Sequence, residues 1–220
     1  MTRKEFCAHQ DHSALGWVVT KDTVRKFCEE VLEYGFGSVC VQPDNVAYAA
    51  SILQGRAEVT ATVGFPLGAH TTVVKIAEAL QAIEDGADHI DVVINHSRLH
   101  EGDDAYVLEE LKAIVQAAKA KKPSVGVKVI MYMPFSPVQS VSQEETIRAA
   151  DLIIQSGADY IKFCKDFALI RKHVDGRVKM KHSGCADFDM AVEAIELGCD
   201  RIGHDCMPQI LAENALFFGE

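Results

Sequence analysis

The stretch Gly86-Ala87-Asp88-His89-Ile90-Asp91-Val92-Val93-Ile94-Asn95 decides the fold, because it joins the end of a helical segment to a short apolar strand. The same junction, a Gly and a small residue followed by Asp, recurs at Gly157-Ala158-Asp159 and at Gly198-Cys199-Asp200. Each copy follows an amphipathic run typical of a helix and precedes a strand-like run. The recurrence predicts equivalent β–α units around one parallel sheet.

Strands and helices alternate along the whole chain. Strands are predicted over residues 37–41, 59–65, 89–95, 125–131, 159–164, 177–181 and 200–203, with a weaker first strand around 6–11. Helices are predicted over residues 20–34, 71–85, 103–121, 142–156 and 186–197. Eight such units fit a single-domain (β/α)8 TIM barrel over residues 1–220. The alternative is a doubly wound open sheet, but its usual Gly-x-Gly-x-x-Gly fingerprint is absent from the sequence.

The composition excludes several classes of partner. Of the 220 residues, 48% are hydrophobic and 25% charged, which suits one large core. A formal charge of −10 argues against a nucleic-acid surface, and we expect no nucleic-acid partner. We expect no membrane partner, because no apolar run approaches the ~20 residues that cross a bilayer. The mixed-charge beginning of the chain and the seven scattered cysteines favour a reduced, cytoplasmic protein.

Two lysines, Lys162 and Lys181, lie where neighbouring buried strands are predicted to end. A buried ammonium is costly unless it is paired or deprotonated, and two close ammonium groups each favour the neutral form of the other. Strand alternation places both side chains inside the barrel, together with Asp91, Lys128 and Lys179. One neutral amine would form a Schiff base with a carbonyl, and the other would stay charged. Asp91 would balance the charge and move protons through a water molecule.

Several segments, in chain order, resemble the deoxyribose-phosphate aldolase family over nearly the whole sequence. They are Asp11-His12-Ser13, 38–43, the Gly64-Phe65-Pro66-Leu67-Gly68 run with Val63 before it, 89–95, Lys128-Val129-Ile130, 157–162, Lys181-His182-Ser183-Gly184 and Arg201-Ile202-Gly203.

The resemblance implies a (β/α)8 barrel and a cofactor-independent class I aldolase, a carbon–carbon lyase. It implies that Lys162 forms the Schiff base, that Lys181 tunes it and that Asp91 assists proton transfer. Asp11 and Cys40 would line the pocket of a small carbonyl or sugar substrate, and Lys128 would belong to the polar network. The family commonly forms homo-oligomers, which we expect here.

The sequence departs from the family around the expected phosphate site. After Lys162 the usual Thr-Ser-Thr-Gly is replaced by Phe163-Cys164-Lys165-Asp166, and the loop before Lys181 looks shortened. Of two usual glycines only Gly184 remains, and Asp187 stands where the family has Arg.

The last strand and a further position also differ from the family. Gly203 is followed by His204-Asp205-Cys206 instead of small and hydroxyl residues, and Tyr132 replaces a usual Glu. Backbone amides, a helix N-terminus and Arg are what bind a phosphate dianion, whereas Asp187 and Asp205 would repel one. We therefore expect Gly184, Asp187, Gly203 and Asp205 to contact an unphosphorylated substrate.

Three alternatives remain open. The chain is compatible with a TIM-barrel isomerase or synthase that uses Lys162 or Lys181 as an acid or base. It is also compatible with a non-catalytic relative that binds a small carbonyl or sugar. His182, His204 and Asp205 lie near predicted strand ends and could bind a divalent metal. Small residues filling a pocket and solvated side chains explain such positions more simply, so no metal and no cofactor are predicted.

Overall fold

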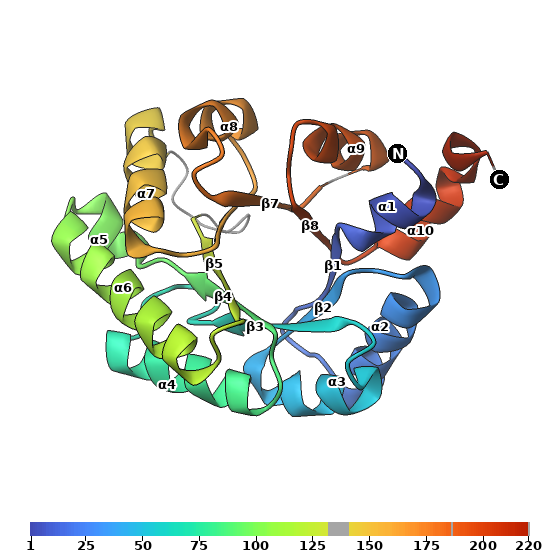
Figure 1. Ribbon diagram of the computed structural model, residues 1–220, viewed down its shortest axis with the longest axis horizontal. Helices are drawn as coiled ribbons and strands as arrows, with labels where there is room; N and C mark the ends of the chain where they lie inside the picture. The colour runs from blue at the N-terminus through green and yellow to red at the C-terminus, as the bar shows by residue number, and fades with distance from the viewer. Residues whose placement is uncertain (132–140, 186, 220) are drawn as a thin grey trace.

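The computed structural model describes residues 1–131, 141–185 and 187–219. Eight parallel strands, β1 to β8, close into a barrel in sequence order, and helices surround it (Figure 1). The predicted (β/α)8 barrel is confirmed. The strands are β1 Gln10–Ala14, β2 Ser38–Val41, β3 Glu58–Val63, β4 His89–Val93, β5 Gly126–Ile130, β6 Tyr160–Phe163, β7 Lys179–Ser183 and β8 Arg201–His204.

The helices of the described residues vary widely in length. They are α1 Arg3–Ala8, α2 Lys21–Tyr34, α3 Val46–Leu53, α4 Thr72–Glu84, α5 His96–His100, α6 Asp104–Lys121, α7 Gln143–Ser156, α8 Phe167–Val174, α9 Phe188–Glu196 and α10 Met207–Glu213, with 3-10 turns η1 Pro43–Asn45 and η2 Ala215–Phe218. The shorter ones, α3, α5, α8 and α10, were not predicted, because a few turns of helix give too little periodic pattern.

The recurring junction has a structural reason. In each copy the Asp carboxylate accepts the backbone N–H of the second residue of the preceding strand. Asp88 accepts from Val59 at 3.0 Å, and Asp159 accepts from Val127 at 2.8 Å. The third copy, Asp200, repeats this with Met180 at 2.9 Å. These bonds satisfy strand donors at the amino-terminal end of the barrel and so fix the register of three strand pairs.

Apolar and polar side chains separate by strand phase. On β4, Ile90 and Val92 are fully buried in the hydrophobic core cluster, whereas Asp91 between them belongs to the polar network described below. The layer between barrel and helices is therefore apolar, as expected for parallel strands covered by helices. The interior is instead rich in charge, which is costly unless every charge has a partner.

A second buried ion pair supports the carboxyl end of β4. Lys75 of α4 and Glu110 of α6 are both fully buried, with 2.7 Å between Nζ and Oε2. Lys75 also donates to the carbonyl oxygen of Val93 at 2.9 Å. The pair thus ties two helices to the strand end that lies two residues beyond Asp91.

The predicted first strand is wrong in position. Residues 3–8 form α1, because the side chain of Thr2 accepts the N–H of Glu5 and Glu5 accepts the N–H of Thr2 in a capping box. Phe6 is buried on this helix and packs against Phe188 and Phe218, with ring centroids 5.2 and 5.7 Å away. The two ends of the chain therefore lie side by side (Figure 1), and β1 begins only at Gln10.

Candidate functional site

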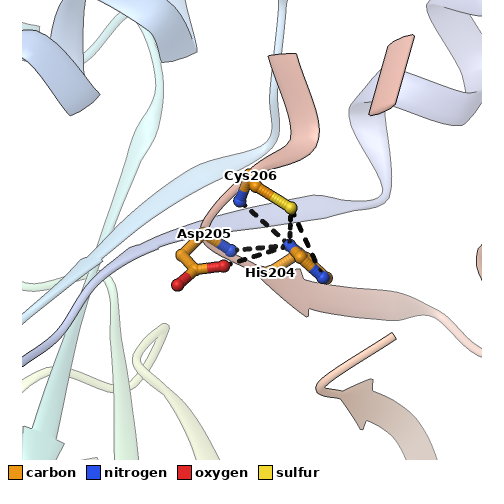
Figure 2. Close-up of side chains that lie close together, drawn as sticks. All are labelled: His204, Asp205 and Cys206. Carbon is orange, nitrogen blue, oxygen red and sulfur yellow. Dashed lines mark hydrogen bonds and ion pairs between the residues drawn. The ribbon is translucent and has the colours of Figure 1, made fainter. Parts of the chain in front are cut away.

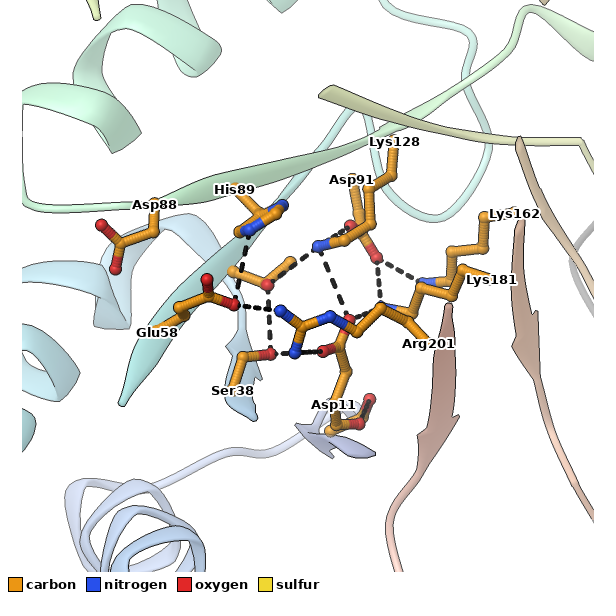
Figure 3. A network of polar contacts seen from close by, with 12 residues as sticks. Asp11, Ser38, Glu58, Asp88, His89, Asp91, Lys128, Lys162, Lys181 and Arg201 are labelled. Carbon is orange, nitrogen blue, oxygen red and sulfur yellow. Dashed lines mark hydrogen bonds and ion pairs between the residues drawn. The ribbon is translucent and has the colours of Figure 1, made fainter. Parts of the chain in front are cut away.

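Four neighbouring strands bring the predicted polar residues together inside the barrel. Asp91 of β4 is in register with Lys128 of β5, and Lys162 of β6 with Lys181 of β7. Parallel neighbours are about 4.8 Å apart, so side chains of the same phase converge. Figure 3 shows the four side chains pointing toward one another. The strand phase inferred from the sequence is confirmed for these residues.

Asp91 lies at the centre of the three lysines. Its Oδ2 is 2.6 Å from Nζ of Lys162 and 3.0 Å from Nζ of Lys181, and its Oδ1 is 3.2 Å from Nζ of Lys128. Burial opposes ionisation of Asp91, but the attraction of Lys128, Lys162 and Lys181 holds its pKa well below the usual range. Asp91 is therefore a carboxylate at neutral pH.

Asp11 on β1 is the second carboxylate of the network. Its Oδ2 is 2.5 Å from Nζ of Lys181 and 3.5 Å from Nζ of Lys128, and its Oδ1 accepts the hydroxyl of Ser38 at 2.7 Å. Burial works against its ionisation, but Lys181, Lys128 and Arg201 more than compensate and lower its pKa strongly. Asp11, expected from the resemblance to line the substrate pocket, thus contacts two of the lysines, and its contact with substrate stays a prediction.

The two lysines of the predicted catalytic pair differ in their surroundings. The side chain of Lys181 is fully buried and contacts both Asp11 and Asp91. Burial disfavours its charge, but the two carboxylates raise the pKa of Lys181 well above its usual value. The side chain of Lys162 is 7% exposed, and among the described residues its ion-pair partner is Asp91 alone. Lys162 is the more accessible and less tightly held amine.

Cys40 and Gly203 lie beside the network. Cys40 on β2 is fully buried, and burial, followed by the charge of Asp91, raises the pKa of its thiol. A Cβ added to Gly203 would lie 3.3 Å from Cε of Lys181. This glycine therefore leaves room for the lysine, and its contact with substrate stays a prediction.

The other predicted substrate residues lie toward the carboxyl ends of β7 and β8. Gly184 is exposed, with φ of 75°. Asp187 is the N-cap of α9, and its Oδ1 accepts the N–H of Met190 at 2.9 Å. The side chain of Asp205 is 72% exposed, with Oδ1 3.3 Å from Nδ1 of His204. Two exposed carboxylates thus stand at this rim, defined here by Gly184, Asp187 and Asp205.

The candidate metal ligands are only partly brought together. His204, Asp205 and Cys206 form a compact group (Figure 2), whereas His182 contacts Cys185 Sγ at 3.1 Å instead. Nδ1 of His204 is 2.9 Å from both the Asp205 and the Cys206 backbone nitrogens, so it is the acceptor of the ring. A metal bound through Nδ1 would displace both of these N–H donors. The group is better explained as a local cap.

Sequence reasoning missed the lower layer of the network, which is the part that lies toward the amino-terminal end of the barrel. Arg201, Glu58 and His89 join Asp11 to the amino-terminal end of the barrel (Figure 3), and Thr60 accepts a hydrogen bond from Lys128 at 3.1 Å. Strand phase carried a signal for Arg201, since it is two residues before Gly203 on the same strand. The long-range partners could not be read without the barrel register.

Lys179 lies at the edge of the barrel interior. Lys179 has the predicted inward phase, but it is exposed at the start of β7, with Nζ 5.3 Å from the centroid of the Tyr160 ring. It is therefore outside the buried lysine group, because the strand has not yet entered the interior. Tyr132 lies outside the described residues.

A closed parallel barrel that converges buried lysines and carboxylates on its interior is the architecture of a (β/α)8 enzyme. The DeoC/LacD family aldolase model matches residues 7–184. A deoxyribose-phosphate aldolase from Caldicellulosiruptor saccharolyticus is 39% identical, covering 97% of this chain and 100% of its own. One from Alkaliphilus oremlandii is 41% identical, covering 93% of this chain and 94% of its own.

Solved structures give the same result. The aldolase QR15 superposes with a TM-score of 0.84 at 33% identity, covering 98% of this chain and 96% of that one. A putative deoxyribose-phosphate aldolase from Coccidioides immitis has a TM-score of 0.88 at 28% identity, covering 98% and 87%. The chain belongs to the DeoC/LacD aldolase family and is a lyase of the aldolase class. Among the described residues, the helices are too short or too polar to span a bilayer.

Proposed function

We propose that this protein is a class I aldolase in which Lys162 forms the Schiff base. The observation that carries the proposal is the position of Lys162 in the buried network. It is the most exposed of the three buried lysines, at 7% against 1% for Lys128 and 0% for Lys181. A carbonyl substrate would therefore meet this amine first.

The charge balance of the network supports a neutral amine. Four cations, Lys128, Lys162, Lys181 and Arg201, contact three carboxylates, Asp11, Glu58 and Asp91. Loss of one proton from this set leaves every carboxylate with a cation. Lys162 shares its carboxylate with two other lysines, so its deprotonation strands no buried anion.

The reaction follows from this arrangement. The neutral Nζ of Lys162 attacks the carbonyl carbon of a 3-hydroxyaldehyde, and loss of water gives an iminium ion. When the 3-hydroxyl loses its proton, the bond between carbons 2 and 3 breaks and carbon 3 leaves as the first aldehyde. The electron pair of that bond forms the double bond between carbons 1 and 2, and the C=N electron pair moves to nitrogen, which gives an enamine. Protonation of carbon 2 and hydrolysis then release the second aldehyde and free Lys162.

Asp91 and Lys181 would serve this sequence electrostatically. The iminium nitrogen is cationic, and ionised Asp91, whose Oδ2 lies 2.6 Å from Nζ of Lys162, stabilises it. Asp91 would also pass protons to and from a water molecule. Lys181 stays protonated because Asp11 and Asp91 raise its pKa, and this fixed charge favours the neutral form of Lys162.

We further propose a substrate without a terminal phosphate. The rim carries the Asp187 and Asp205 carboxylates, and Asp187 already accepts an N–H at the N-terminus of α9. A phosphate dianion placed there would compete with one carboxylate for helix donors and be repelled by both. A hydroxylated or cationic end would instead find hydrogen-bond acceptors.

The test is a screen of aldehyde and ketone donors against phosphorylated and unphosphorylated acceptors, with borohydride trapping of each active pair. Activity is expected with an unphosphorylated acceptor, together with a reduced adduct on Lys162. Lys162→Ala should lose both, whereas Lys179→Ala, which removes an exposed lysine from the neighbouring strand, should keep both. Efficient cleavage of deoxyribose 5-phosphate with an inert unphosphorylated analogue would contradict the substrate proposal.

Assembly and location are proposals of the same kind. Large apolar side chains of the described residues are exposed, among them Trp17 at 102%, Leu216 at 88% and Phe217 at 54%. Such groups support contact with a second copy of the chain, and light scattering would test this as a mass above that of one chain. All seven cysteines are free, which supports a reducing, cytoplasmic compartment.

A further inference from the structure

Arg201 connects the lysine network to the amino-terminal end of the barrel. Its Nη1 is 3.4 Å from Oδ1 of Asp11, and its Nη2 is 2.5 Å from Oε2 of Glu58 (Figure 3). The same Glu58 oxygen is 3.4 Å from Nε2 of His89. One guanidinium therefore spans two carboxylates, one inside the network and one below it.

The chain makes room for this arrangement with two glycines. A Cβ on Gly37 would lie 2.1 Å from Nη1 of Arg201, and a Cβ on Gly126 would lie 2.1 Å from Nδ1 of His89. Real side chains do not approach so closely, so any other residue at either position would displace the group. Neither glycine has a positive φ, and therefore space rather than backbone freedom explains both.

Arg201 contributes charge and orientation but no proton. A guanidinium does not deprotonate in proteins, so this connection cannot carry protons out of the barrel. It does hold Asp11 from the side opposite Lys181, since the two cations contact different carboxylate oxygens. Removing it would free Asp11 to rotate and would delete one positive charge from the buried set.

We propose that Arg201, held in place by Glu58, is a positioning residue of the aldolase site. It orients Asp11 toward Lys181, and its fixed positive charge favours the neutral amine that the chemistry needs at Lys162. The inference rests on the proposed Schiff-base function and adds a residue that acts through Asp11 without touching substrate.

Several other ionisable groups face this set and contribute to the same balance. They are Cys40 on β2, His89 and Asp91 on β4, Lys128 on β5, Tyr160 on β6, and Lys179 and Lys181 on β7, with Asp88 beside Glu58 in the cavity below. All of them stay unchanged in the variants below, so differences between variants report the altered residue and its effect on Asp11.

A cavity of about 480 Å³ opens at Arg201 on the amino-terminal face, lined also by Glu58, Asp88 and Arg56. This cavity provides a matched control residue, Arg56, for the experiment below. Arg56 carries the same charge on the same cavity, but its guanidinium bonds the carbonyl oxygens of Leu53 and Ile52 and not the network. The cavity also gives a small cation a path to the place of Arg201.

The experiment measures the rate of adduct formation on Lys162 with acetaldehyde and cyanoborohydride across pH, relative to a free-amine standard in the same buffers. For Arg201→Gln we expect the midpoint of the rate profile to move by about half a pH unit toward alkaline pH, because a cation is lost. In Glu58→Gln the amide oxygen can still accept the Arg201 N–H, so Arg201 stays in place, and we expect a smaller shift toward acid because only an anion is lost. Arg56→Gln should leave the midpoint unchanged.

The opposite signs separate this role from a merely structural one. If both variants lower the rate without moving the midpoint, or move it in the same direction, the proposal is wrong. If Arg201→Gln does not fold, the direction in which Glu58→Gln moves the midpoint of the pH–rate profile still tests the proposal. Methylguanidinium at millimolar concentration should restore the profile of Arg201→Ala, and a lack of rescue in the folded variant would count against the proposal. Absence of any adduct in the unmodified protein would instead refute the Schiff-base function.

Discussion

The barrel interior and the rim at the ends of β7 and β8 differ in the burial and pairing of their carboxylates. In the interior, Asp91 and Asp11 each contact several cations, and both carboxylates are almost completely buried. At the rim, Asp187 and Asp205 are exposed, and they contact Met190 and His204 close to them in the chain. The interior can change little, because removal of Asp91 would take from Lys162 its ion-pair partner among the described residues. The exposed rim tolerates more change, so we expect chemistry and substrate preference to be separable in this fold.

The largest effect should come from the nucleophile. Lys162→Arg keeps a positive charge beside Asp91 but supplies no amine that forms an imine. We expect kcat/KM for aldol cleavage to fall by at least about 10³-fold, while thermal stability stays close to that of the parent. Steady-state kinetics and a melting curve check both halves. Residual activity above a tenth of the parent would mean that another group is the nucleophile.

Asp91→Asn should destabilise the folded protein through the charge network inside the barrel. The three lysines lose a shared buried anion, and we expect a loss of about 3–5 kcal/mol in the free energy of unfolding. Denaturant unfolding measures it. A matched change at the rim, Asp205→Asn, removes an exposed carboxylate and should stay within about 0.5 kcal/mol. Equal effects of the two variants would erase the distinction between interior and rim.

The interior should also dominate the acid stability of the protein. Asp11 and Asp91 have depressed pKa values in the folded state, so the unfolded chain binds protons more readily. Their contribution is fully present above the unfolded carboxyl pKa of about 3.9 and is lost as pH falls toward the lower folded values. Unfolding free energy should therefore drop steeply below about pH 4. A stability that is flat down to pH 3 would contradict the ion pairing.

Substitutions at the rim should increase activity toward a phosphorylated substrate instead of removing activity. Asp187→Arg with Asp205→Ser restores the residue types that the family resemblance places at a phosphate site. We expect the ratio of kcat/KM for deoxyribose 5-phosphate over 2-deoxyribose to rise by about tenfold, because a carboxylate pair is replaced by one cation. The control, Asp187→Asn, keeps a helix cap and removes one charge, so its ratio should rise less.

The smallest effect concerns the cap alone. Asp187→Ala removes the acceptor for the Met190 N–H at the start of α9 and should cost about 1 kcal/mol of stability. Asp187→Ser, which keeps an acceptor, should cost less. Thermal unfolding distinguishes them. If Asp187→Ala is neutral, the carboxylate is retained at the rim for some reason other than the helix cap.

Much of the fold and of the interior could be predicted from the sequence. Repeated junctions and strand phase sufficed for the barrel and for the meeting of Asp91, Lys128, Lys162 and Lys181, because alternation in a parallel strand is strict. The error at the first strand came from a local capping box that outweighed an apolar pattern.

The lower layer of the site was beyond reach for a different reason. Arg201 and Glu58 are far apart in the chain and meet only through barrel closure, so no spacing rule links them. The sequence indicated Asp187 only as a substitute for a phosphate-binding Arg, and the structure shows that it is also the N-cap of α9.

One measurement tests interior and rim together. The protein is incubated with equal amounts of unlabelled deoxyribose 5-phosphate and 2-deoxyribose isotopically labelled at its first two carbons, reduced with borohydride and mapped by mass spectrometry. We predict a two-carbon adduct on Lys162 that carries mainly the label of the unphosphorylated sugar. An adduct on another residue, or no adduct, would contradict the proposed nucleophile, and an unlabelled adduct on Lys162 would contradict the proposed substrate.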